Sequence, residues 1–280
     1  MLKQSSVWAP ILAIGIAIFA SAALLAGTAN ALDINELLDD AIDGPHRSEE
    51  NRARDPYRHP RETLLFFGLT PHLTVVEISP AAGWYTEIIA PVLRQNGKFI
   101  GAAPALSPDS PDIFKRRDAA YKNMLVNDPI LYGSSTAVTF DPSEPSVAPP
   151  NSVDMVLTFR NVHNWAKAGT IDAMFKAFYE ALRPGGILGV VEHRAKPGTN
   201  FQKQIDSGYM TEAYVIDVAQ RAGFKLVETS EINHNPRDTA DHPGGVWNLP
   251  PSLRGVQDKD KSHYLAIGES DRMTLKFFKN

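Results

Sequence analysis

The chain has 280 residues, of which 43% are hydrophobic and 21% charged, and its formal net charge is −4. This composition is that of an ordinary globular protein, and the negative balance argues against a general nucleic-acid binder, which needs excess basic residues to contact phosphates. The sequence contains no cysteine, which excludes disulfides, thiolate metal ligands and cysteine nucleophiles.

The N-terminus has the features of a targeting segment. Lys3 precedes an apolar run over residues 7–26, and the small residues Ala29 and Ala31 follow it. A secretory signal peptide shows this order of charge, apolar stretch and small-x-small site. An uncleaved anchor is the alternative, because a run of about 20 apolar residues can span a bilayer. We expect a signal peptide over residues 1–31, cleaved after Ala31, and a periplasmic or secreted mature protein without a stable membrane span.

The rest of the chain alternates between expected helices and strands. Residues 32–70 are predicted to be an N-terminal helical extension, in which Pro60 can begin a helix, and residues 71–280 one further domain. Strands are expected at residues 73–78, 98–103, 137–140, 153–159, 187–191, 225–232 and 273–279, and helices at 84–95, 113–125, 171–182 and 211–222. A long loop is expected between the last two strands. This order predicts a doubly wound α/β fold.

Polar side chains follow the fourth and fifth expected strands. They are Asn161, His163 and Asn164 after the fourth, and Glu192, His193 and Arg194 after the fifth. Ligands of open α/β sheets bind outside the carboxyl ends of the strands. His163 and His193 are therefore candidate general bases with Asn161 beside them, since a carboxylate can orient an imidazole that titrates near neutral pH. The alternative is that these side chains only hold the loops together.

A second group of ionisable residues lies in the expected long loop. Its members are His234, Asp238, Asp241 and His242. Their spacing matches no common metal-ligand pattern, and turn-forming residues surround them. We therefore expect no metal site there.

Three segments resemble the class I S-adenosylmethionine (SAM) dependent methyltransferases. Residues 75–83 (Val-Val-Glu-Ile-Ser-Pro-Ala-Ala-Gly) stand in the place of the family's acidic, glycine-rich first motif. Residues 153–158 resemble its fourth strand, and residues 181–188 (Ala-Leu-Arg-Pro-Gly-Gly-Ile-Leu) its turn into the fifth. Residues 80–87 and 160–165 are similar to a group of exported bacterial predicted methyltransferases. The resemblance covers residues 73–279.

This resemblance implies a Rossmann-like, mostly parallel seven-stranded sheet with helices on both faces, and a SAM-dependent methyltransferase that acts on a small molecule. A tight turn of small residues lets backbone N–H groups approach the cofactor. The implied SAM-binding residues are Glu77, Ser79, Ala81, Gly83, Trp84, Ala103, Asn164 and Trp165. Trp165 can stack on the adenine ring or cover the core, and Trp84 can wall the pocket or pack on the sheet.

The chain departs from the family pattern at two places. Ser79 and Ala81 replace two of the three glycines of the first motif, and Ala103 stands where the family usually has an acid for the ribose hydroxyls. We therefore expect weak SAM binding. Two other functions remain open: a non-catalytic binding protein on this fold, or a SAM-independent hydrolase or lyase with His163 or His193 as base.

Overall fold

The computed structural model describes Met1 and residues 33–280. Apart from Met1, the predicted signal peptide lies outside the described residues, as does its cleavage site after Ala31. Within the described range, no helix is both long and apolar enough to cross a membrane.

The described residues build a seven-stranded sheet in the order β3-β2-β1-β4-β5-β7-β6. The strands are β1 (Thr74–Ile78), β2 (Lys98–Pro104), β3 (Ser135–Phe140), β4 (Val153–Phe159), β5 (Leu182–His193), β6 (Lys225–Ser230) and β7 (Arg272–Phe278). Strands β1 to β5 pair in parallel, and β7 lies antiparallel between β5 and β6. The predicted mostly parallel α/β sheet is confirmed. Strand order reverses between β1 and β4, where open α/β sheets bind ligands.

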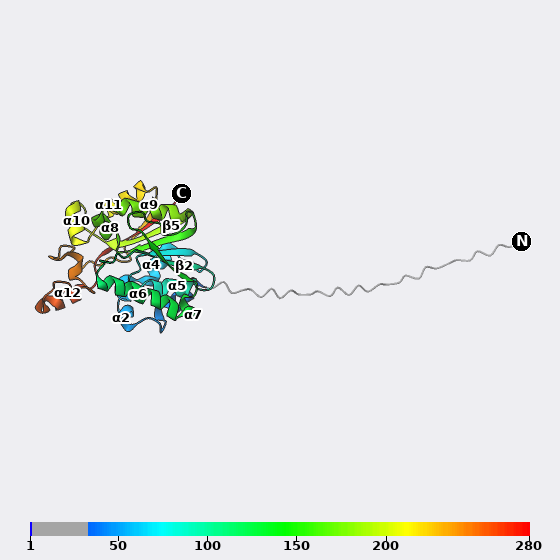
Figure 1. Cartoon of the computed structure of the whole chain (residues 1–280), viewed down its shortest axis with the longest axis horizontal. Coiled ribbons are helices and arrows are strands. Elements are labelled where there is room, and N and C mark those ends of the chain that lie inside the picture. Colours follow the sequence, from blue (N-terminus) through cyan, green and yellow to red (C-terminus); the bar gives the residue numbers. More distant parts are fainter. Residues whose placement is uncertain (2–32) are drawn as a thin grey trace. The chain divides into compact units, whose positions relative to one another are not determined.

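Helices cover both faces of this sheet. They are α1 (Ile34–Asp43), α2 (Glu49–Arg52), α3 (Asp55–Arg58), α4 (Pro60–Phe67), α5 (Thr86–Leu93), α6 (Asp112–Asn127), α7 (Pro129–Tyr132), α8 (Val162–Ala168), α9 (Ile171–Ala181), α10 (Phe201–Ser207), α11 (Glu212–Arg221) and α12 (Lys261–Ile267). Figure 1 shows α9 and α11 on one side of the sheet and α5 and α6 on the other.

Each central strand contributes to two cores. Val76 and Val156 belong to the core beneath α9 and α11, whereas Val75 and Met155 belong to the core beneath α1, α4, α5 and α6. Successive side chains of a strand point to opposite faces, so both faces of these strands are buried. This burial is why β1 and β4 have nearly continuous apolar sequences.

Strand β5 begins five positions earlier than predicted. Leu182 pairs with Val153 whereas Ile187 pairs with Met155, so residues 183–186 form a bulge in β5. Gly185 has a φ of 86°, a conformation that glycine adopts without strain. The turn predicted after the helix over residues 171–182 is therefore the first, irregular part of the strand.

Several other elements differ from expectation. Thr170 is the N-cap residue of α9, but its side chain makes no capping hydrogen bond. Helices α8, α10 and α12, each of seven residues, were not predicted. Helix α12 and two short 3₁₀ turns at residues 245–248 and 258–260 interrupt the expected long loop. Such short segments carry too few turns to show helical periodicity in the sequence.

Candidate functional site

The turn after β1 has the backbone of a glycine-rich loop, although two of its glycines are missing. Ser79, Ala81 and Gly83 have φ values of 52°, 54° and 86°. A residue with a Cβ pays about 1–2 kcal/mol for this left-handed conformation. A Cβ at Gly83 would also lie 2.7 Å from Met124 Cε. Strained residues of this kind gather at functional sites, where the surrounding structure holds them.

A cavity of about 520 Å³ opens beside this turn, at the carboxyl ends of β1, β2 and β4. Six residues singled out from the sequence line it: Ser79, Ala81, Ala103, Asn161, Asn164 and Trp165. We name it the large cavity. Its volume lies within the range of about 300–1,000 Å³ that is usual for small-molecule sites.

Trp165 packs in the core and also lines the large cavity. Its ring makes edge contacts with Phe178, at 5.5 Å between centroids, and with Phe175 in α9. The same side chain lines the large cavity and is 9% exposed. Trp165 therefore belongs to the core and also presents an aromatic surface to any bound ligand.

Helix α6 supplies one wall of the large cavity that sequence reasoning missed. Phe114, Arg117, Asp118 and Tyr121 line it and lie on one helical face, three and four positions apart. Their spacing could have revealed the common face, but not that this face covers the ends of β1 and β2. Asp118 places a carboxylate at the cavity, although position 103, where the family usually has an acid, is alanine.

A second, smaller cavity of about 150 Å³ adjoins the first. Ser79, Ala81 and Asn161 line both cavities, while Glu77 and Arg160 line only the small one. The Asn161 amide donates to the carbonyl of Ile78 at 3.0 Å and to Oγ1 of Thr158 at 3.2 Å. Asn161 therefore joins the ends of β1 and β4 at the boundary between the two cavities.

Glu77 is an almost fully buried carboxyl at the end of β1. Its Oε2 accepts a hydrogen bond from the Thr86 hydroxyl at 2.6 Å. Burial raises the pKa of Glu77 to about 7, although the Thr86 hydrogen bond and the charge of Arg160 oppose the rise. Near neutral pH this side chain is therefore present in both protonation states.

Trp84, which also lines the small cavity, packs against the N-terminal helices. Its indole N–H donates to the carbonyl of Asn51 at 2.9 Å. The guanidinium carbons of Arg47 and Arg58 lie 5.1 and 4.6 Å from the ring centroid. Such cation–π contacts fix the ring, so Trp84 ties helices α2 and α3 to the site.

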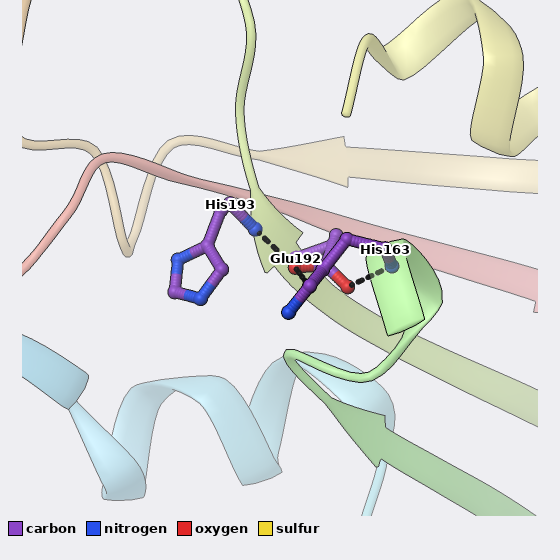
Figure 2. Close-up of side chains that lie close together, drawn as sticks. All are labelled: His163, Glu192 and His193. Carbon is purple, nitrogen blue, oxygen red and sulfur yellow. Dashed lines mark hydrogen bonds and ion pairs between the residues drawn. The ribbon is translucent and has the colours of Figure 1, made fainter. Parts of the chain in front are cut away.

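The two predicted catalytic histidines lie together, but neither lines the large or the small cavity. His163, at the start of α8, and His193, at the end of β5, have ring centroids 5.4 Å apart (Figure 2). Glu192 Oε1 accepts from the backbone N–H of His193 at 2.7 Å and lies 3.1 Å from His163 Nδ1. Its Oε2 accepts from the backbone N–H of His163 at 3.2 Å. A carboxylate oxygen accepts, so the His163 proton is on Nδ1 and Nε2 has the lone pair.

His163, Glu192 and His193 also offer ligand atoms within 4.8 Å of one another, as a metal site would. The surroundings disfavour a cation. Burial lowers the pKa of His193 well below its usual value, and His163, Arg160, Arg272 and Arg58 lower it further. The two oxygens of Glu192 already accept three N–H groups. This cluster therefore suits a neutral base better than a metal ion.

The remaining candidate residues hold loops together. His242 Nε2 lies 2.9 Å from Asp238, whose carboxylate accepts from the Tyr209 hydroxyl. His234 contacts Asp271 at 2.9 Å, and Lys196 donates to Asp241 at 3.2 Å. Arg194 bonds three carboxylates, those of Glu212, Glu231 and Asp271. These bonds tie the segment after β6 to the end of β5.

Comparison with known proteins places the fold. No protein-family model matches the sequence, and no curated protein does. Among solved structures, a SAM-dependent methyltransferase from Aquifex aeolicus is similar at a TM-score of 0.50 and 17% identity, over 72% of this chain and 93% of that one. The [4+2]-cyclase SpnF is similar at a TM-score of 0.55 and 15% identity, over 88% of this chain and 92% of that one.

The fold and the cavity at its strand ends define an α/β protein with a cavity at the topological switch point, where ligands of this fold bind. More narrowly, the chain has the class I SAM-dependent methyltransferase fold. The second of these neighbours is a cyclase, so the fold by itself leaves the reaction open.

Proposed function

We propose that this protein is a SAM-dependent methyltransferase that acts on a small molecule in the cell envelope. The observation that carries the proposal is the strained turn of Ser79, Ala81 and Gly83 beside the large cavity. Backbone strain of this kind is common at functional sites, so the two left-handed positions without glycine beside the cavity support a ligand site. The apolar run and the Ala29–Ala31 pair support the envelope location.

The residues of the large cavity fit SAM. Small side chains at Ser79, Ala81 and Ala103 leave room close to the backbone. Trp165 offers an aromatic surface for the adenine ring, and the Asp118 carboxylate can accept hydrogen bonds from the ribose hydroxyls in place of the missing acid at Ala103. When bound, SAM supplies an electrophilic methyl group on a sulfonium.

The chain's own residues would orient the acceptor. The small cavity shares Ser79, Ala81 and Asn161 with the large one, so a molecule there lies next to the cofactor space. His163, whose Nδ1 faces Glu192, lines neither cavity, so its part would be to hold α8 against the end of β5 rather than to contact the acceptor. Orientation of two bound reactants supplies much of the rate of such a transfer.

Titration with S-adenosylhomocysteine tests the proposal. The mature protein should bind it with a Kd in the high micromolar range, because the family's ribose acid and two motif glycines are replaced; a lost charge-assisted hydrogen bond costs about 1.5–3 kcal/mol. Asp118→Asn should weaken binding further, while Asp112→Asn, on an exposed residue of the same helix, should not. Absence of binding by the mature protein would contradict the proposal.

A second function is favoured by one observation. The His163–Glu192 pair is complete without any cofactor, as a SAM-independent hydrolase or lyase would need. Turnover of a small-molecule substrate without SAM, lost in His163→Gln, would favour this second function over methyl transfer. Binding of a small molecule without turnover would instead indicate a non-catalytic binding protein.

A further inference from the structure

Four arginine side chains, those of Arg54, Arg58, Arg160 and Arg272, lie near the buried carboxylate of Glu269, which pairs with three of them. Glu269 Oε1 accepts from Arg54 at 2.7 Å, and its Oε2 accepts from Arg58 at 3.0 Å and Arg272 at 3.2 Å. Burial would raise the pKa of Glu269, but Arg58, Arg272 and Arg54 outweigh it and hold the pKa at about 2. Glu269 therefore stays ionised, yet it balances only one of these positive charges.

Arg160 is the fourth arginine, and it lines the small cavity. Its side chain makes no hydrogen bond or ion pair with the described residues; only its backbone N–H is engaged, to the carbonyl of Val191 at 2.7 Å. Its φ of 62° is left-handed, a strained conformation for a residue with a long side chain. The strained backbone thus holds an unpaired guanidinium at the wall of a cavity.

Arg58 adds a second positive charge behind Arg160. It is 1% exposed, and its Nη1 has no hydrogen-bond partner among the described residues. Burial lowers the pKa of Arg58 well below its usual value, and the charge of Arg160 is the next cause. The nearby carboxyl of Glu77 has a pKa of about 7 and so neutralises Arg160 only in part. The small cavity therefore carries an uncompensated positive charge.

Such a surplus is unfavourable unless an anion fills the cavity. Bound SAM would not lower the total charge of the site, because its sulfonium, ammonium and single carboxylate sum to a net positive charge. We propose that Arg160, backed by Arg58, binds an anionic group, a carboxylate or a phosphate, of the methyl acceptor. The assignment to the acceptor rests on the proposed function; the anion site itself does not.

The cavity suits a group of this size. Its volume of about 150 Å³ holds only a few molecules the size of water, enough for a carboxylate or phosphate but not for a whole large acceptor. The two cavities meet at Ser79, Ala81 and Asn161, so the rest of the acceptor can extend toward the cofactor. A planar guanidinium binds either anion through two parallel N–H groups.

Thermal unfolding with inorganic phosphate as the probe tests the site. Phosphate should raise the Tm of the mature protein by about 2–4 °C over chloride at equal ionic strength. Arg160→Gln should abolish this shift and, in chloride, should melt above the unmodified protein because it removes an unpaired charge. Arg117→Gln removes one positive charge from the large cavity, which does not include Arg160, and should keep the phosphate shift. The anion site would be overturned if phosphate raised the Tm of Arg160→Gln as much as that of the unmodified protein. It would also be overturned if phosphate did not raise the Tm of the unmodified protein.

S-adenosylhomocysteine separates the two possible sources of the anion. If the site serves the acceptor, the phosphate shift persists when S-adenosylhomocysteine is saturating. If the shift disappears, Arg160 binds the carboxylate of the cofactor, and the acceptor assignment is wrong. A protein that responds to phosphate but does not bind S-adenosylhomocysteine contradicts the proposed function and supports the anion site alone.

Discussion

His163 and Glu192, which lie 29 positions apart in the sequence, contact each other twice. Glu192 accepts from the backbone N–H of His163 through Oε2 and lies 3.1 Å from its Nδ1 through Oε1. Glu192 is fully buried and His163 is 6% exposed. The pair therefore fixes the first turn of α8 against the end of β5, and it sets the tautomer of the histidine as well.

This pairing changes the expected outcome of His163→Ala. A candidate base at a cavity could be replaced with little loss of stability, but here the buried Glu192 would lose a donor, and we expect a loss of about 1–3 kcal/mol in the free energy of unfolding. His163 does not line the large cavity, so the affinity for S-adenosylhomocysteine should stay the same. Urea unfolding and calorimetric titration measure the two quantities, with His163→Gln as the milder control. A strong loss of affinity with unchanged stability would contradict this expectation.

Ala103→Asp should strengthen cofactor binding. Ala103 lines the large cavity at the end of β2, where an acid can accept hydrogen bonds from ribose hydroxyls. A charge-assisted hydrogen bond of about 1.5–3 kcal/mol corresponds to a tenfold or larger gain in affinity. Isothermal titration with SAM and S-adenosylhomocysteine measures it. Ala105→Asp adds the same charge two positions later and should leave the affinity unchanged; an equal gain in both variants would point to charge alone.

Ala81→Gly and Ser79→Gly should each stabilise the protein. Glycine removes about 1–2 kcal/mol of left-handed strain and loses about 0.4–1 kcal/mol through the greater entropy of the unfolded chain, so a net gain of up to about 1.6 kcal/mol is expected. Ala82 lies in the same turn and has no positive φ. Ala82→Gly should therefore destabilise, and chemical denaturation compares the three. If all three lost stability alike, the backbone strain at Ser79 and Ala81 would be refuted.

Stability should fall as the pH rises from about 4.5 to 7 through the contribution of Glu77. The folded-state pKa is raised to about 7, so between these values the folded protein binds more protons than the unfolded chain, and proton release favours unfolding. The raised pKa corresponds to about 3 kcal/mol, fully present below pH 4.5 and lost above pH 7. Glu77→Gln keeps an acceptor for the Thr86 hydroxyl and should flatten the dependence of stability on pH in this range. Urea unfolding at several pH values measures this dependence. An unchanged slope would show that Glu77 is already ionised.

Processing at the N-terminus is tested on protein recovered from a cell-envelope fraction. The apolar run over residues 7–26 and the Ala29–Ala31 pair predict a mature chain that begins at Leu32. Intact-mass measurement should find that species. A full-length chain in the membrane fraction would instead indicate an uncleaved anchor.

The fold was predictable because its signals are local. The run of buried residues in β1, the turn after it and the Arg183–Gly186 segment each identify an element without reference to the rest of the chain. Strands that mostly alternate with helices then leave few arrangements, since parallel strands require crossover connections of one handedness. The short helices α8, α10 and α12 were missed because their formation depends on tertiary packing more than on periodicity.

The site was only partly predictable. The sequence determined which residues follow the ends of β1, β2, β4 and β5, and so placed Ser79, Ala81, Ala103 and Asn161 at one edge of the sheet. Only the tertiary structure decided that His163 turns toward Glu192 and away from that cavity, and that α6 brings Asp118 to it. It alone gathers Arg54, Arg58, Arg160 and Arg272 around Glu269, and Arg54 and Arg58 lie more than 200 positions before Glu269 in the sequence. Local sequence encodes backbone conformation and burial, whereas a charge balance arises from side chains that meet only when the chain is folded.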